Sequence, residues 1–538
     1  MKKHNIIIGL ILIVLSSSCS DFLDRVPLDF VSPDNFLTNE AQSQILLNGV
    51  YAKITMQDDS YRQTFPIHEA SLTDDVYDSQ PWHETTEWAR GQGTAQSALP
   101  NWFWKTNYQG VARANVFISS IKKATFSSSL IPRLTAEAKF LRAWYYNQLI
   151  TYFGDVPLIL EPGDLTNGQP TRTPKDEIVA QILQDLEEAI PVLPQTYEDA
   201  KDAGRVTKGA AMGLKARVLL YQSRWAEAAQ AAKEVMDLKQ YTLFPDYQGL
   251  FLEKNEEAAS KSEIMFQRYY TKDIDPSFLS EYIGLWPALA PTKQLVDCYY
   301  MSDGLPITES DRYDRANPFM NRDPRLKATI FYPGSKYFNN RQGAPGLEYV
   351  QDSVPTPEWI LSVTGFRCKK HLDGKIMENK DEGRNAYLMR YGEILLTYAE
   401  AQNEASGPDK SVYNAIDQLR IRVGMITLTK AMPNLSKEKM REVIRNERRV
   451  ELAIEGLRWP DIRRWRIGEK VMVDAIGLDM SLLKGGQYPG DGKGETKDWI
   501  YKDIVVDKRQ FNPARDYLLP IPQEEMTANP NMTQNPNY

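Results

Sequence analysis

The stretch from Thr207 to Leu238 reads TKGAAMGLKARVLLY, QSR and WAEAAQAAKEVMDL, two segments rich in small residues on either side of a short polar break. Apolar residues recur at helical spacing in both segments: Leu214, Val218 and Tyr221 in the first, and Trp225, Ala228, Ala229, Ala232 and Val235 in the second. Small Ala and Gly side chains let two helices approach closely, with Tyr221 and Trp225 filling the wedge between them. The short break predicts an antiparallel pair of helices.

A helix pair of this composition fits two architectures. Stacked helix–turn–helix units with small residues at their interfaces are typical of tetratricopeptide arrays. A single helical hairpin inside another all-α domain produces the same pattern, and this stretch alone does not separate the two. In both cases it predicts scaffold and not chemistry.

Other parts of the chain predict further helices. Helical spacing of apolar residues extends over Glu40–Met56, Asn101–Lys123, Thr135–Phe153, Pro174–Ile190, Leu388–Ala405, Val412–Val423 and Ser436–Ile454. Helices that follow one another through short turns predict a superhelix of pairs. The last of these ranges also carries a face of Arg and Glu, which predicts either solvent exposure or internal ion pairing.

These patterns divide the chain into five parts. They are a signal peptide (1–18), an extended tether (19–34), a helical part (35–240) that contains a long loop at 57–100, an irregular loop-rich region (241–385), and a second helical part with an extended tail (386–538). The loop-rich region is rich in aromatic residues that need burial or a ligand. We therefore expect it to pack on the helices and not to act as a linker.

The composition bounds the class of protein. The chain has 538 residues, of which 42% are hydrophobic and 25% charged, enough for a large core. A net charge of −7 argues against nucleic acid as a partner, because phosphates require clustered Lys and Arg. Three cysteines are too few for a disulfide framework, and the sequence leaves open whether Cys298 and Cys368 pair.

The N-terminus predicts export and a lipid anchor. Lys2 and Lys3 precede an apolar run, Ile6–Leu15, which has the length of a signal peptide and is too short to span a bilayer. Cys19 follows directly after small serines, as in a bacterial lipobox, although Ser16 stands where a Leu is usual. We expect Cys19 to be the lipid attachment site. Ordinary cleavage, with Cys19 as a bystander, is the alternative.

Two loops contain aromatic and charged residues that no predicted helix accounts for. The segment 57–100 is punctuated by Pro and Gly and carries Asp74, Asp75, Tyr77, Trp82, His83, Trp88 and Arg90. Loops of this length in compact domains are usually functional. The second loop is Tyr282–Trp286. The alternative role for Trp82 and Trp88 is to anchor their loop to the core.

The sequence lacks the motifs of catalysis and of metal binding. His83 is not followed by a second His four positions later, so the zinc-protease motif fails, and outside the signal peptide only His68 and His371 remain besides it. No Gly-x-Ser-x-Gly elbow, phosphate-binding loop or dinucleotide fingerprint occurs. We expect no enzymatic activity, no cofactor and no metal.

Short motifs recur in a specific order over nearly the whole mature chain. They are Cys19–Asp24, Arg113–Asn115 after Trp104 and Tyr108, Ala136–Leu158, Gly209–Tyr221, Pro291–Asp297, Asn321–Leu326, Arg390–Ala401, Glu447–Asp461, Leu519–Gln523 and Asn535–Tyr538. Each motif is weak by itself. In this order they resemble the SusD/RagB family of lipoproteins.

The resemblance implies a mainly α fold, in which four tetratricopeptide-like helix pairs support a loop-rich region. It also implies an outer-membrane lipoprotein that lies over a SusC-like TonB-dependent transporter and passes glycans to it without catalysis. In starch-binding members of the family, aromatic residues from two loops form an arc against the sugar. The corresponding loops here are 75–90 and 282–286, and the expected ligand-binding residues are Asp75, Trp82, Trp88, Arg90, Tyr282 and Trp286.

A sugar ring offers an apolar face and a rim of hydroxyls. Indole rings match the face, and Asp75 and Arg90 are suited to the hydroxyls. Stacking of this kind predicts affinities in the micromolar to millimolar range. Three alternatives remain: a peptide-binding lipoprotein of the same uptake system, a tetratricopeptide adaptor that binds proteins, and a hydrolytic enzyme.

Overall fold

The computed structural model describes residues 39–54, 68–79, 84–124, 129–163, 168–277, 279, 283, 289–333, 335, 363–372, 383–479 and 502–538. The predicted signal peptide, the tether and Cys19 lie outside these residues. So do three of the predicted ligand-binding residues, Trp82, Tyr282 and Trp286.

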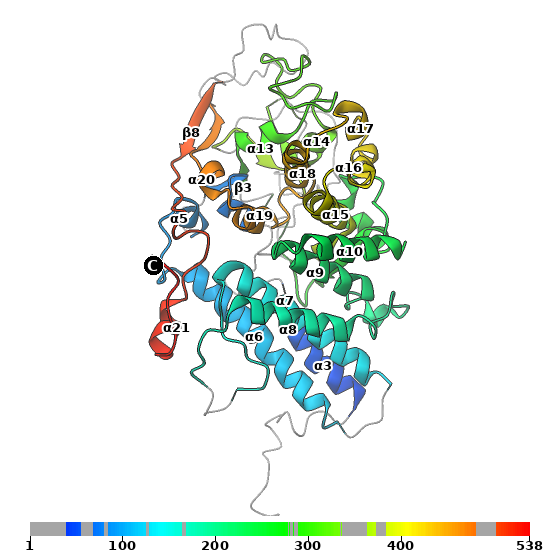
Figure 1. The fold of residues 1–538 in the computed structure, drawn as a ribbon, viewed down its shortest axis with the longest axis vertical. Helices are drawn as coiled ribbons and strands as arrows, with labels where there is room; N and C mark the ends of the chain where they lie inside the picture. The colour runs from blue at the N-terminus through cyan, green and yellow to red at the C-terminus, as the bar shows by residue number, and fades with distance from the viewer. Residues whose placement is uncertain are drawn as a thin grey trace, which may run out of the picture.

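The fold is mainly α, as predicted. Its long helices are α3 (Glu40–Tyr51), α6 (Ala98–Ile121), α7 (Ile131–Phe153), α8 (Lys175–Ala189), α9 (Lys208–Tyr221), α10 (Trp225–Asp237), α15 (Tyr391–Ser406), α16 (Lys410–Arg422) and α18 (Lys437–Glu451). Each packs on its neighbours in a tetratricopeptide-like array, with α7 between α6 and α8, and α10 between α9 and α15. Figure 1 shows the array rising from α3, α6, α7 and α8 through α9 and α10 to α15, α16 and α18.

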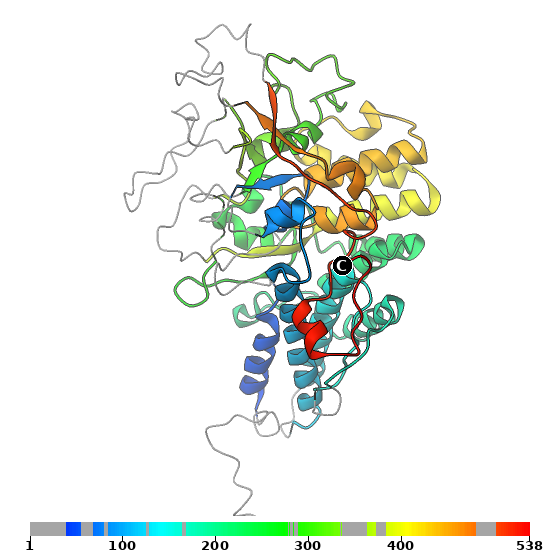
Figure 2. The ribbon, with the colours of Figure 1, turned by 90° about the vertical axis from the view of Figure 1, so that its left-hand side faces the viewer.

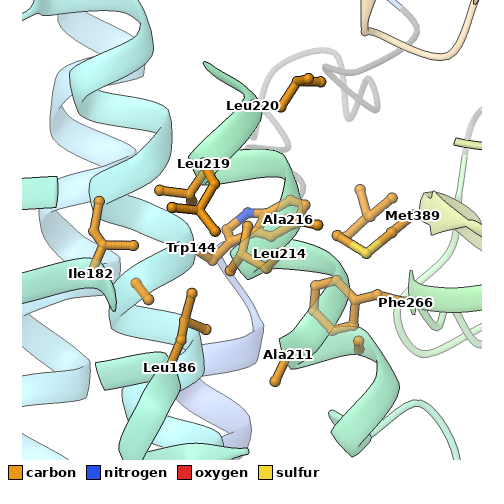
Figure 3. Close-up of a cluster of buried hydrophobic side chains, with 14 of the residues drawn as sticks. Trp144, Ile182, Leu186, Ala211, Leu214, Ala216, Leu219, Leu220, Phe266 and Met389 are labelled. Carbon is orange, nitrogen blue, oxygen red and sulfur yellow. The ribbon is translucent and has the colours of Figure 1, made fainter. Parts of the chain in front are cut away.

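The pair α9–α10 forms where the sequence predicts it. The side chain of Thr207 caps α9 by accepting from the Ala210 N–H, and three residues separate the two helices. Leu214 is fully buried near Trp144 and Phe266, whose ring centres lie 5.3 Å apart (Figure 3). The small residues also allow close contacts outside the α9–α10 interface. A Cβ on Gly213, for example, would lie 2.5 Å from the Met389 sulfur.

The wedge predicted from Tyr221 and Trp225 is not fully buried. Both side chains are half-buried and pack at the edge of the core. Trp225 is the first residue of α10, directly after the turn that joins the helix pair. Tyr221 lies beneath the Arg464 guanidinium, which is 5.3 Å from the centre of the tyrosine ring.

Several predicted helix boundaries are wrong. Helix α3 ends at Tyr51 instead of Met56, and α7 begins at Ile131 instead of Thr135. Two further differences have a clear structural reason. Leu388 and Arg390 belong to strand β6 (Ala386–Arg390), which pairs antiparallel with β2 (Ile264–Arg268), and α15 begins only at Tyr391. Helix α18 ends at Glu451, and Ile454 beyond it has a positive φ of 62°. In each case a tertiary contact or turn overrides an apolar spacing that continues by chance.

In the structure the loop-rich region extends beyond 241–385, because short elements from the loop 57–100 and from residues 458–507 join it. Three of its two-stranded sheets are β1 (Val76–Asp78) with β3 (Leu289–Pro291), β4 (Ile330–Phe331) with β5 (Arg367–Cys368), and β7 (Ala475–Leu478) with β8 (Asp503–Asp507). Short helices α5 (Thr85–Ala89), α13 (Lys293–Cys298), α14 (Pro324–Thr329), α19 (Arg458–Arg464) and α20 (Gly468–Val471) lie between them. Buried residues of β1, β3, β4, β5, β7, α13 and α14 share a second hydrophobic core with Val450 of α18, so this part of the fold packs on the helices, as expected. Ala89, Ile462 and Met472 form a separate small cluster.

Cys298 and Cys368 are free thiols. The Cys298 sulfur donates to the Gln294 carbonyl at 3.1 Å, one helical turn earlier. Burial raises the pKa of Cys298 to about 11, so this thiol stays protonated at neutral pH.

The C-terminal tail returns to the first helices. The Leu519 N–H donates to the Tyr152 carbonyl at 2.7 Å, and the Asn535 amide donates to the Phe153 carbonyl at 2.9 Å. Figure 2 shows the tail, with α21 (Gln523–Ala528), lying against the N-terminal helices. One hydrophobic core therefore runs from Leu47 to Met532 and joins both helical parts. Within the described ranges, no helix is both long and apolar enough to cross a membrane.

The charged face of α18 is paired internally. Arg448 contacts Asp461 at 2.8 Å, and Glu447 contacts Arg325 at 2.6 Å. Glu451 accepts from Arg390 at 2.7 Å. Arg449 reaches Asp74 at 2.8 Å and Asp75 at 2.6 Å. A buried charge requires such a partner, so α18 binds the loop-rich region to the helical array.

The packing of α9 and α10 leads to a first prediction. Leu214→Ala should lower the free energy of unfolding by about 2–5 kcal/mol, because it leaves a cavity in a fully buried site. Trp225→Ala should cost less, about 2 kcal/mol or below, because the ring is only half-buried. Denaturant titration of both variants checks this order, and a larger loss for Trp225→Ala would contradict it.

The ion pairs of α18 lead to a second prediction. Arg449→Met should destabilise the protein by about 3–5 kcal/mol, because it leaves Asp75 buried without its cation. Arg441→Met is the matched control on the same helix, since its partner is Glu404 and its own side chain is 31% exposed. That variant should lose about 1 kcal/mol or less. Equal losses for both variants, measured by thermal unfolding, would refute the role given to Arg449.

Candidate ligand-binding site

The two predicted loops begin at the same short sheet. Strands β1 and β3 pair antiparallel, with Val76 opposite Pro291, Tyr77 opposite Ala290 and Asp78 opposite Leu289. In an antiparallel pair, the end where one strand leaves is the end where the other enters. Trp82 follows Asp78 by four positions, and Trp286 precedes Leu289 by three. The roots of the two loops are therefore side by side, although they are far apart in sequence.

The segment that leads into β1 is held at four successive carbonyl groups. Arg509 donates to the Thr73 and Val76 carbonyls, at 2.5 and 3.0 Å. Thr292 donates to the Asp74 carbonyl through its hydroxyl at 2.6 Å, and to the Asp75 carbonyl through its N–H at 2.9 Å. Because Thr292 directly follows β3, these bonds tie the two strands together beyond their own ladder.

The sequence predicted that Asp75 binds the ligand, but the structure buries this residue. It is 1% exposed, and its carboxylate accepts from Arg449 at 2.6 Å. The neighbouring Asp74 is also buried and pairs with Arg458 at 2.8 Å. Burial alone would raise the pKa of Asp74, but the Arg449 and Arg458 guanidinium groups outweigh it and hold that pKa below its usual value. Both carboxylates serve to fix the strand.

The segment that carries Trp82 is held at both of its ends by Asp78. The Asp78 carboxylate accepts from the Thr85 hydroxyl at 3.1 Å, and the Asp78 carbonyl accepts from the Thr86 hydroxyl at 3.0 Å. His68 lies 3.5 Å from the same carboxylate. These contacts join the end of β1 to the start of α5, that is, the chain before and after residues 80–83.

Trp88 is turned inward. Its ring packs on Gly93, where an added Cβ would lie 2.3 Å from the indole. It borders a cavity of about 30 Å³ that is also lined by Trp459, Arg463 and Phe511. Trp88 therefore anchors the loop to the core, which is the alternative role that the sequence left open.

Arg90 and Tyr77 form the accessible edge of the site. The Arg90 side chain is 39% exposed and contacts Asp507 of β8 at 2.6 Å, a bond that raises the pKa of Arg90. Tyr77 is half-buried and lies between the buried residues Val76 and Asp78, so it points to the other face of β1. Burial and then the Asp507 charge raise the pKa of Tyr77, which keeps its hydroxyl protonated.

Tyr77 is the residue that sequence analysis named in the loop but did not assign to the site. The alternation of buried and exposed positions along a strand identifies it, but that pattern requires knowing that Val76–Asp78 is a strand.

Among the described residues, no group of His, Cys, Asp and Glu side chains is arranged to hold a metal ion.

Comparison with known proteins identifies the family. Residues 249–538 match the model of the SusD family, and residues 21–220 match a model described as starch-binding associating with outer membrane. SusD-like protein P2 of Formosa agariphila is 25% identical over the whole of both chains. A SusD-like protein of Bacteroides ovatus is 26% identical over 97% of this chain and 96% of the relative.

Solved structures agree with this assignment. A SusD-like protein from Bacteroides fragilis superposes with a TM-score of 0.78 at 27% identity, covering 96% of this chain and all of the other. A SusD-like carbohydrate-binding protein from the same organism gives a TM-score of 0.77 at 27% identity, covering 93% of this chain and all of the other. With its family match over more than half of its length and its helix-pair array, this chain belongs to the SusD family.

Proposed function

We propose that this protein is a cell-surface lipoprotein that captures oligosaccharides and delivers them to a SusC-like TonB-dependent outer-membrane transporter. The observation that carries the proposal is the pairing of β1 with β3, which joins the roots of the two aromatic loops. Membership of a carbohydrate-binding, outer-membrane-associated family supports the same conclusion. The protein acts in this scheme as a carrier without catalysis.

The proposed site divides its chemistry between rings and polar groups. Trp82, Tyr282 and Trp286 offer aromatic faces for the apolar side of a sugar ring. Arg90 donates to sugar hydroxyls, and the Tyr77 hydroxyl can donate or accept beside it. The proposed ligand-binding residues thus retain Arg90 from the sequence prediction and add Tyr77. Asp75 and Trp88 have structural roles instead.

A rigid strand at the base of the two loops lowers the entropic cost of binding a flexible ligand such as an oligosaccharide. The backbone of residues 73–78 is held by Arg509, Thr292 and the β1–β3 ladder, so ligand binding need not order it. Two or three stacked rings then contribute at about 25 cal/mol per Å² of apolar surface, which predicts a Kd in the micromolar to millimolar range. Affinity of this order suits a carrier that must release its cargo.

A binding screen of the purified protein against polysaccharides and peptides tests the proposal. With the best ligand, Trp82→Ala and Trp286→Ala should each raise Kd about tenfold, near 1.4 kcal/mol, and leave the melting temperature unchanged. Trp88→Ala is the control from the same loop, and it should lower the melting temperature because its ring packs inward. Unchanged Kd in both loop variants would refute the site, and binding of peptides alone would replace the glycan with a peptide cargo.

The lipid anchor is a separate part of the proposal. Cys19 follows an apolar export segment, and acylation of this thiol would hold the protein at the outer membrane. We expect Cys19→Ala to move the protein from the membrane fraction to the soluble fraction, without loss of ligand binding. Retention of the variant in the membrane, or an intact mass of the wild-type protein that shows no acyl chains, would contradict this.

A further inference from the structure

A second candidate site lies between the first helices and the C-terminal tail. It is a pocket of about 540 Å³ bounded by the end of α7, the start of α8, helix α19 and the tail residues Tyr517 and Asn535. This volume is within the range of small-molecule sites. Its charged lining residues are Arg172, Lys175, Arg463, Arg464, Arg466 and Asp155. Five cations and one carboxylate therefore face one pocket, in a chain whose net charge is −7.

Most of these cations form no contact ion pair with a carboxylate of the described residues. Within the described part of the chain, only Arg464 forms ion pairs, at 2.6 Å with Glu400 and 2.8 Å with Asp461. The single lining carboxylate, Asp155, caps α8 by accepting from the Lys175 N–H at 2.8 Å. The other four cations form no ion pair within 4.0 Å among the described residues, and the carboxylates that act on them, such as Asp155 and Asp516, do so from farther away.

Arg172 and Arg463 are held in place by neutral groups. Arg172 donates to the Asp155 carbonyl at 2.7 Å and to the Asn535 side-chain oxygen at 2.6 Å. Arg463 is 8% exposed, donates to the Tyr517 carbonyl at 2.7 Å, and lies 4.1 Å over the Trp459 ring. The Arg463 Nε has no hydrogen-bond partner in the described structure.

This arrangement differs from that of most buried arginines elsewhere in the fold, although Arg322 is likewise buried and bonded only to backbone carbonyls. Arg142, Arg217, Arg325, Arg390 and Arg448 each contact at least one carboxylate. Burying a cation without an anion costs free energy. Consistent with that cost, burial lowers the pKa of Arg463 to about 10 and also lowers the pKa of Lys175. An anion in the pocket would remove the penalty.

We propose that this pocket binds an oxyanion group of a small ligand, a carboxylate, sulfate or phosphate, through Arg463, Lys175 and Arg466. The planar guanidinium groups supply paired N–H donors that match two oxygens of such a group, and the Lys175 ammonium supplies a point charge. The volume exceeds that of a lone ion, so it accommodates an acidic ligand of about the size of one sugar. The proposal does not depend on the function of the β1–β3 site, because the two sites share no proposed ligand-binding residue.

Titrations of the purified mature protein with sodium sulfate, sodium phosphate and sodium glucuronate test this proposal. Ionic strength is held constant with sodium chloride, so that general screening does not contribute. At least one oxyanion should bind saturably by calorimetry and raise the melting temperature. Uncharged glucose should not bind. The oxyanion that binds most tightly identifies the group as a carboxylate, sulfate or phosphate.

Variants at the accessible edge locate the binding. Arg466→Gln and Lys175→Gln should each raise Kd at least about tenfold, because each removes a charge-assisted hydrogen bond. Arg463→Lys keeps the charge but loses the planar fork, and it should also weaken binding. Lys470→Gln is the matched control, since Lys470 is exposed on α20, outside the pocket lining. Absence of saturable binding by all three oxyanions overturns the proposal, as does equal binding of glucose or an unchanged Kd in Arg466→Gln and Lys175→Gln.

Discussion

The ion pairs of helix α18 are the contacts on which the rest of the structure depends. Buried charges are tolerated only with partners, and α18 carries several of them into the interior. Through Arg448 and Arg449 the helix holds α19 and the entry to β1, and through Glu447 and Glu451 it holds Arg325 and Arg390. The helical array and the loop-rich region are thereby one body, and neither completes its charge pairing without the other.

This arrangement separates support from recognition. The residues that fix β1, namely Asp74, Asp75, Thr292 and Arg509, are buried. Of the aromatic residues of the proposed site, Tyr77 lies in β1 itself, and Trp82, Tyr282 and Trp286 belong by sequence to the segments that flank the sheet. Loops on a rigid scaffold can change sequence without changing the fold. We propose that the two loops, joined at their roots by the β1–β3 ladder, form a single ligand-binding surface.

Sequence alone predicted the long helices well, because helical spacing over a dozen or more residues is a strong pattern. It did not predict the three-residue strands β1 and β3, whose partners are chosen by tertiary contacts. Asp75 was assigned to the ligand because its partner, Arg449, is 374 residues away. Helical spacing likewise predicted that Trp225 packs against the helix pair, but not that the side chain is only half-buried. The cationic pocket was missed for the same reason, since its lining comes from six separated segments.

The most direct test of a single ligand-binding surface is hydrogen–deuterium exchange, measured with and without the ligand found by screening. Bound ligand should slow amide exchange in peptides that cover residues 79–90 and in peptides that cover 280–289, over the same concentration range. Because the roots of both loops are paired, one ligand should protect both segments together. Protection confined to one of the two segments, or protection elsewhere with neither affected, would contradict a single surface built from both loops.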